Sequence, residues 1–230
     1  MGGADWQAGS LKDPAEGRVS MYLWNREMQV APGHLNEGVT GLVDAITYVN
    51  GVSAYEFRLW ATVLGTFGRL GVGSTCDDFG AFSEEMATRG MDDESFRGKV
   101  DAVGKCLAGN PEDSVWNVIH TTGDAYEVRP VIAIIDNEWE TSQMGGVVAA
   151  TIDMADHLNS LAGTPVTVAV STWGTGPSVR IMFGYDTVGQ VQERTAVAMV
   201  DPGFQDRGRA FNAEFGSTRD GRSSVLRRIV

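Results

Sequence analysis

A repeat offset of 109 residues is the feature that most constrains this chain. Apolar positions recur by class at this offset, since Val39 corresponds to Val148 and Val72 to Ile181. Identical residues recur as well: Asp44, Asn50, Gly65, Thr66, Asp77, Gly80 and Asp92 reappear as Asp153, Asn159, Gly174, Thr175, Asp186, Gly189 and Asp201. A duplicated fold retains its turn glycines and its core positions. The offset exceeds the about 20–50 residues of solenoid repeats, so each copy is a small domain or half of a shared one.

Composition narrows the classes of function. With 230 residues and 43% apolar content, the chain can bury a substantial core. Its net charge of −12 argues against unaided binding to nucleic acid or to an anionic membrane surface, which would require a basic face. No apolar run reaches the about 18 residues of a membrane span, and Asp5, Trp6 and Gln7 do not suit a signal peptide. Because Cys76 and Cys106 provide no disulfide framework, we expect a reducing, cytoplasmic location.

Hydrophobic periodicity predicts the same order of elements in both copies. In the first copy we expect a strand over 19–30, a helix over 34–49, a hairpin of strands over 55–64 and 69–75, helical segments over 77–87 and 93–107, and a strand over 114–121. In the second copy we expect a strand over 127–135, a helix over 142–161, a hairpin over 165–173 and 178–185, mostly helix over 188–215, and a strand over 224–230. Each copy therefore has the βαββαβ order of a ferredoxin-like domain. The predicted organisation is an N-terminal arm over 1–18, a first repeat over 19–123 and a second repeat over 124–230.

Local motifs add a resemblance to a known superfamily. Asp77 to Gly80, followed by the restart from Asp93 to Phe96, resembles the second helix of the dimeric α/β-barrel superfamily in its fused form. The segment from Asp186 to Phe204 stands at the corresponding place in the second copy. The resemblance implies an α+β fold in which two ferredoxin-like halves close one eight-stranded barrel. The superfamily includes cofactor-free monooxygenases of aromatic polyketides, cyclases, isomerases, haem-dependent chlorite dismutase-like enzymes, dye-decolourising peroxidases and stress-related proteins.

Alternation along the predicted strands selects candidate site residues. Arginines and tryptophans on one face suit a flat, partly oxygenated ligand, because rings stack on Trp while Arg holds a phenolate or carboxylate. We expect Arg58 to stabilise an oxyanion and His120 to move a proton. The expected substrate-binding residues are Trp24, Arg26, Trp60, Trp116 and Trp173.

Other chemistries are less well supported by the residues. His157 lies roughly where chlorite dismutase-like proteins carry their proximal haem ligand, although the neighbouring Met154 and Asp156 do not resemble that family's motif. The paired acids Asp77–Asp78 and Asp92–Asp93 suit helix caps, so no metal site is predicted. Neither a dinucleotide-binding loop nor a phosphate loop occurs in the sequence.

The resemblance, together with these candidate residues, implies a small-molecule enzyme of secondary metabolism. The expected activity is that of a cofactor-independent oxygenase, cyclase or isomerase acting on an aromatic or polycyclic, polyketide-like substrate. Two alternatives stay open: a protein that only binds a hydrophobic ligand, and a haem enzyme that uses His157. A further interpretation is structural: the two halves are retained because they form an assembly surface. Pairing of two chains into a homodimer is also left open.

Overall fold

The computed structural model describes residues 21–123, 128–218 and 220–230. The predicted arm over 1–18 and the predicted start of the first strand lie outside these ranges. The first half contains β1 (Met21–Gln29), α1 (Leu35–Val52), β2 (Phe57–Leu64), β3 (Arg69–Cys76), α2 (Phe79–Asp92), α3 (Glu94–Gly104) and β4 (Glu112–Thr121). The second half contains β5 (Val131–Glu138), the 3-10 turn η1 (Thr141–Gln143), α4 (Met144–Ala162), β6 (Val166–Trp173), β7 (Ser178–Tyr185), α5 (Val188–Val200), α6 (Pro202–Phe215) and β8 (Asp220–Arg228).

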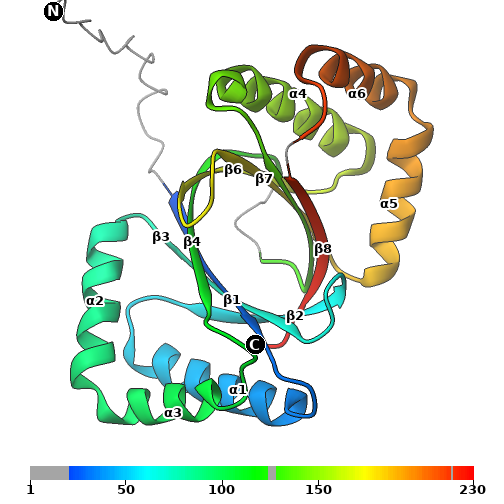
Figure 1. The fold of residues 1–230 in the computed structure, drawn as a ribbon. Helices are drawn as coiled ribbons and strands as arrows, with labels where there is room; N and C mark the ends of the chain where they lie inside the picture. Colours follow the sequence, from blue (N-terminus) through cyan, green and yellow to red (C-terminus); the bar gives the residue numbers. More distant parts are fainter. Residues whose placement is uncertain (1–20, 124–127, 219) are drawn as a thin grey trace, which may run out of the picture.

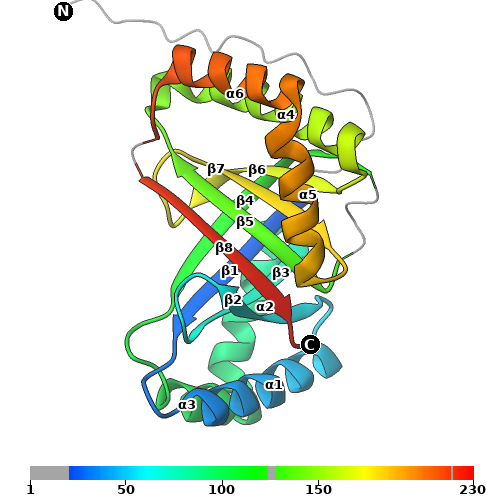
Figure 2. The ribbon, with the colours of Figure 1, turned by 90° about the vertical axis from the view of Figure 1, so that its right-hand side faces the viewer.

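The eight strands close into one antiparallel barrel, which confirms the expected α+β fold of two fused ferredoxin-like repeats. Around the barrel the order is β1-β3-β2-β8-β5-β7-β6-β4. Each half supplies four neighbouring strands, and the two seams are the pairs β2–β8 and β4–β6. The described helices lie outside the barrel. In Figure 1, α1, α2 and α3 lie at the lower left and α4, α5 and α6 at the upper right, and Figure 2 shows α4 and α6 above the strands and α1 and α3 below them. Each four-stranded sheet thus has a helix-covered face and a face that lines the barrel lumen.

Aspartate caps divide the second helical region of each half into two helices. Asp93 accepts a hydrogen bond from the backbone N–H of Phe96 at 2.9 Å, and Asp201 accepts one from Phe204 at 2.7 Å. The Phe96 N–H helps to hold the pKa of Asp93 below its usual value. The segment 188–215, predicted as mostly helix, is therefore two helices that meet at Asp201. Such a cap satisfies amide groups that would otherwise lack partners at the start of a helix.

Strand ends differ from the predictions where local chemistry prevents pairing. β5 begins at Val131, directly after Pro130, whose nitrogen cannot donate to a sheet ladder. The predicted start of this strand at 127 lies outside the described residues. β8 begins at Asp220 and pairs with β5 along its length, although periodicity predicts a start at 224. Polar residues at the start of β8 give no alternating signal, so the pairing partner determines its length.

Separate apolar cores fill the two helix-covered faces. In the first half, the rings of Trp24, Tyr55, Phe57 and Phe82 contact one another with centroids 5.0–5.9 Å apart. In the second half, Trp139 contacts Phe211 at 5.3 Å. Within the described residues, every helix is too short or too polar to span a bilayer.

Candidate functional site

The register of the first sheet decides which aromatic residues can share a cavity. Trp24 and Phe57 both lie opposite Ser74 of β3, whereas Trp60 lies opposite Gly71. Directly opposed residues of antiparallel strands point to the same face of the sheet. Trp24 therefore faces the helices with Phe57, and Trp60 faces the lumen. One substrate cannot stack on both Trp24 and Trp60, contrary to the expectation from alternation along single strands.

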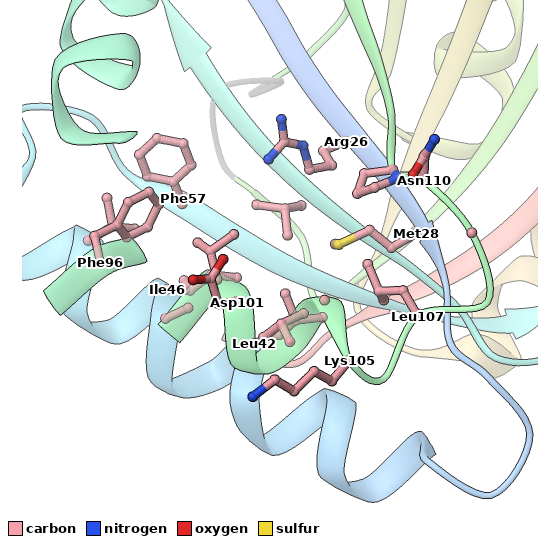
Figure 3. Close-up of a pocket in the computed structure, with 18 of the residues that line it drawn as sticks. Arg26, Met28, Leu42, Ile46, Phe57, Phe96, Asp101, Lys105, Leu107 and Asn110 are labelled. Atoms are coloured by element: carbon pink, nitrogen blue, oxygen red, sulfur yellow. The ribbon is translucent and has the colours of Figure 1, made fainter. Parts of the chain in front are cut away.

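The larger space beside these tryptophans lies on the helix-covered face of the first half. This helix-side cavity has a volume of about 450 Å³, within the range of about 300–1,000 Å³ that is typical of ligand pockets. Figure 3 shows Arg26 and Met28 on the strand wall and Leu42 and Ile46 on the α1 wall. The apolar lining consists mainly of Trp24, Met28, Leu42, Ala45, Ile46, Val49, Phe57, Val72, Phe96, Val100, Val103 and Leu107.

Few polar side chains reach this cavity. Arg26 donates from Nε and Nη2 to the two carboxylate oxygens of Asp113, each at 2.7 Å, and its guanidinium lies 5.3 Å from the centroid of the Trp24 ring. The paired carboxylate fixes the guanidinium beside the ring, and the side chain remains 38% exposed. Among the described lining residues, the other charged groups are Asp101 and Lys105. An apolar cleft with a few polar groups suits a ring-containing ligand that carries one or two oxygens.

The lumen holds several cavities, and the one that contains the predicted residues Arg58 and Trp60 has a volume of about 140 Å³. Arg58, Trp60 and Arg180 line it, which confirms that Arg58 and Trp60 share a face of β2. The Nη2 of Arg58 is paired with Glu56 at 2.6 Å, while its buried Nε has no hydrogen-bond partner. Arg180 is only 3% exposed and forms two hydrogen bonds of 2.7 Å with Asp136. The volume of this lumen cavity is below that of typical pockets for ring-containing ligands. A neighbouring cavity of about 430 Å³ shares Asn25, Ile134 and Leu226 with it, but most of its described lining is polar, which suits an apolar ring system less well.

His120 does not point into the lumen with Arg58. Its Nε2 lies 2.7 Å from Oδ1 of Asp156 on α4, and it is absent from the lining of both cavities. The pairing of β4 with β6 shifts register between Val118 and His120. A bulge inserts an extra residue, so the alternation of faces changes at that point. The expected shared face of Trp116 and His120 is interrupted for this reason.

The other two predicted tryptophans lie apart from the helix-side cavity. Trp116 is 1% exposed, donates from Nε1 to Ser114 Oγ at 2.9 Å and stacks under the Arg180 guanidinium at 4.1 Å. This residue is a packed part of the lumen wall. Trp173 ends β6, is 73% exposed and lines neither cavity. Of the predicted site residues, the structure brings only Trp24 and Arg26 to the large cavity.

His157 has a structural counterpart in the first half. Nε2 of His157 lies 2.7 Å from Oδ1 of Asp201. At the same place in the first half, the hydroxyl of Tyr48 donates to the two carboxylate oxygens of Asp93 at 3.0 and 3.1 Å. Tyr48 precedes His157 by the repeat offset of 109 residues, and Asp93 and Asp201 both cap the last helix of their half. The hydrogen bond from His157 is the largest cause that lowers the pKa of Asp201. His157 thus holds a helix cap.

Haem does not fit at His157 in this arrangement. The helix-side cavity of the second half has a volume of about 190 Å³, below the range of typical ligand pockets, and His157 is not part of its described lining. Tyr185 in that lining is buried, which raises its pKa to about 12, so its hydroxyl stays protonated near neutral pH. Nε2 of His157 is engaged by Asp201, so this nitrogen is not available to bind iron.

Sequence reasoning missed the contribution of α3 to the helix-side cavity. Phe96, Val100 and Val103 recur at helical spacing and form the wall that faces the sheet. This apolar stripe was a usable signal for the helix. The charged residues Asp101 and Lys105 on the same segment could not be identified as cavity residues without knowing that α3 packs over β1.

Comparison with known proteins supports the fold. No protein-family model matches the chain, and no curated protein matches it. Among solved structures, it is similar to a proposed monooxygenase from Fusobacterium nucleatum, with a TM-score of 0.68, 11% identity and coverage of 93% of this chain and 94% of the other. An anthrone oxidase-like protein matches with a TM-score of 0.69 and 11% identity, over 93% and 92% of the two chains. This chain has the fused dimeric α/β-barrel fold.

A chlorite dismutase structure shares the fold at lower similarity. A mutant chlorite dismutase from Candidatus Nitrospira defluvii matches with a TM-score of 0.52 and 9% identity, over 90% of this chain and 91% of that one. At identities this low, structural similarity establishes the dimeric α/β-barrel fold alone, and this fold hosts several activities. The residues of the cavity must therefore decide the function.

Proposed function

We propose that this chain is a cofactor-independent oxygenase that takes a flat, apolar, anthrone-like aromatic substrate into the helix-side cavity. The observation that carries the proposal is the cavity of about 450 Å³ in which Arg26 lies beside the Trp24 ring. The described lining is mainly apolar and aromatic, which favours a ring system over a sugar or a nucleotide. The descriptions of two similar structures, a proposed monooxygenase and an anthrone oxidase-like protein, agree with this substrate class.

The proposed reaction uses the substrate itself as the reductant. The methylene opposite the ketone in the central ring of an anthrone loses a proton to form a conjugated enolate, which reacts with dioxygen at that carbon to give a hydroperoxide. Loss of water then leaves a carbonyl, so each methylene converted consumes one O₂ and releases one H₂O. We assign Arg26 to the enolate oxygen, because its guanidinium lies beside the Trp24 ring, on which the substrate stacks, and can stabilise developing negative charge there. We assign Asp101 to the proton, because it is the only carboxylate among the described lining residues.

The test is oxygen consumption with anthrone as substrate, measured for the unchanged chain and for single variants. Arg26→Gln should lower kcat/KM about 100-fold, as expected for the loss of one oxyanion-stabilising group. Asp101→Asn should lower kcat with little change in KM, because it removes the proton acceptor and leaves the apolar walls intact. Trp24→Leu should mainly raise KM, because it removes the ring on which the substrate stacks.

Trp173→Leu is the matched control, because Trp173 is exposed and lines neither cavity. It should leave turnover unchanged, while circular dichroism verifies that all the variants fold. Equal losses in Trp24→Leu and Trp173→Leu would refute the location of the site. Anthrone binding without oxygen consumption would instead favour the second candidate, a protein that only binds hydrophobic ligands in the same cavity.

A further inference from the structure

A cluster of three metal-ligating side chains lies outside the helix-side cavity, at the corner where α1 begins and α3 has ended. His34, Glu37 and Cys106 place a ring nitrogen, a carboxylate oxygen and a thiol sulfur within 4.8 Å of one another. Cysteine, histidine and glutamate are three of the ligand types that Zn²⁺ accepts in proteins. Sequence spacing does not reveal this set, because Cys106 is about 70 residues from the other two along the chain.

The spacing of the ligand atoms is compatible with a tetrahedral zinc site. Nδ1 of His34 lies 3.2 Å from Oε2 of Glu37. Two ligand atoms on tetrahedral bonds of about 2.0–2.1 Å are about 3.3–3.4 Å apart, so these two atoms already have the required separation. A Zn–S bond of about 2.3 Å places sulfur about 3.5 Å from such atoms. Cys106 therefore needs to approach by at most about 1.3 Å from the 4.8 Å limit.

Backbone hydrogen bonds hold the two segments of the cluster together. The N–H of Ala31 donates to the carbonyl of Cys106 at 2.8 Å, and the N–H of His34 donates to the carbonyl of Ala31 at 3.1 Å. Gly38 allows the close approach, because an added Cβ would lie 3.3 Å from a methyl of Val30 and 3.5 Å from Cβ of Cys106. The ligands are thus brought together by the fold, which lowers the cost of ordering them on a metal.

Exposure at the cluster differs between its outer and inner members. The side chains of His34 and Glu37 are 49% and 74% exposed, whereas Cys106 is 3% exposed. A cation can therefore reach the two outer ligands from solvent and use the thiolate below them. Three protein ligands leave a fourth tetrahedral position for water.

The second half provides an internal comparison at the same corner. At the repeat offset, Gln143 and Gly146 stand in place of His34 and Glu37. The ring of Phe215 packs against Gly146, since a Cβ built there would lie 2.8 Å from the ring, and Gln143 donates to the carbonyl of Phe215 at 3.2 Å. One copy of the duplicated corner is filled by a phenyl ring and the other holds three ligand atoms. The fold alone therefore does not require a ligand set at this place.

We propose that His34, Glu37 and Cys106 bind one Zn²⁺ ion. Cys106 lies between Lys105 and Leu107, which both line the helix-side cavity. Metal binding here fixes the segment that leads from α3 into β4, and so supports one wall of that cavity. This site is independent of the oxygenase proposal, because no reacting atom is assigned to the metal.

The test is titration of the metal-free protein with Co²⁺, followed by displacement with Zn²⁺. One equivalent of Co²⁺ should produce tetrahedral d–d bands and a thiolate-to-cobalt charge-transfer band, and Zn²⁺ should abolish both. Cys106→Ser should lose the charge-transfer band. Cys76→Ala is the matched control, because Cys76 is the other buried cysteine and lies outside the cluster. This control should retain the spectrum.

Two exposed substitutions keep the proposal testable if Cys106→Ser does not fold. His34→Gln and Glu37→Gln alter surface side chains and should each weaken Co²⁺ binding. Binding by the unchanged chain should also strengthen as pH rises, because the thiol and imidazole must lose protons to coordinate the metal. The absence of a stoichiometric band, a band that survives Cys106→Ser, or unchanged affinity in both exposed variants would overturn the proposal.

Discussion

Replacing Arg180 by Met should be among the most destabilising single changes in the lumen. The guanidinium is 3% exposed, stacks on Trp116 at 4.1 Å and makes two hydrogen bonds of 2.7 Å to Asp136. Met fills a similar volume and leaves the Asp136 carboxylate, 22% exposed, without its cation. Removing one partner of a buried ion pair costs about 3–5 kcal/mol of the free energy of unfolding. At about 2–4 °C per kcal/mol for a chain of this size, Tm should fall by about 6–20 °C.

The assay is urea unfolding followed by circular dichroism, with the double variant Arg180→Met, Asp136→Leu as the control. If the penalty comes from an uncompensated carboxylate, the double variant should recover most of the lost stability, because both charges are gone. If Arg180→Met lowers the free energy of unfolding by less than about 1 kcal/mol, the pair contributes no more than an exposed ion pair, and the reasoning is refuted. A double variant as unstable as the single one would refute it as well.

Three further predictions concern the caps, the hairpins and the lumen. Asp201→Ala should lower the urea midpoint at neutral pH, because it removes a helix cap. The folded-state pKa of Asp201 is lowered, so its contribution is present above the unfolded-state pKa and is lost as pH falls through the folded-state value; the midpoints of the two chains should therefore converge in acid. Gly174→Ala should lower the free energy of unfolding by at least about 1 kcal/mol in the same assay, because φ is +91° and the new Cβ would meet the carbonyl oxygen of Asp113. An unchanged midpoint would contradict this backbone constraint. Arg58→Gln should leave anthrone oxidation unchanged in the oxygen electrode, because Arg58 lines the lumen cavity; a loss of activity would move the site into the barrel.

The duplication and the periodicity of apolar residues were enough to predict the βαββαβ order of each half, and the resemblance to the dimeric α/β-barrel superfamily then implied the closed barrel. The repeat identified Asp44 and Asn50, and the structure gives both a role: Asp44 pairs with Lys99, and Asn50 exchanges hydrogen bonds of 2.7 and 2.8 Å with the backbone of Phe57. Asp153 pairs with Arg207 in the same way in the second half. Such recurrent contacts hold helices and strands at fixed positions, so a duplicated sequence preserves them.

The site was less predictable, because it depends on relations between elements. Alternation within β1 and β2 groups Trp24 with Arg26 and Arg58 with Trp60, but only the pairing of both strands with β3 shows that the two groups face opposite sides. The bulge beside His120 is likewise set by the partner strand. For this reason the catalytic pair of Arg58 and His120 expected from the sequence is not brought to one cavity.

The most direct test of the oxygenase proposal is a crystal structure of the chain with anthrone bound in the absence of dioxygen. We predict electron density for the ring system in the helix-side cavity, beside Trp24 and Phe57, with the ketone oxygen within hydrogen-bond distance of Arg26. Density for the ligand in the lumen, among Arg58, Trp60 and Arg180, would contradict the account and return the site to the other face of the sheet.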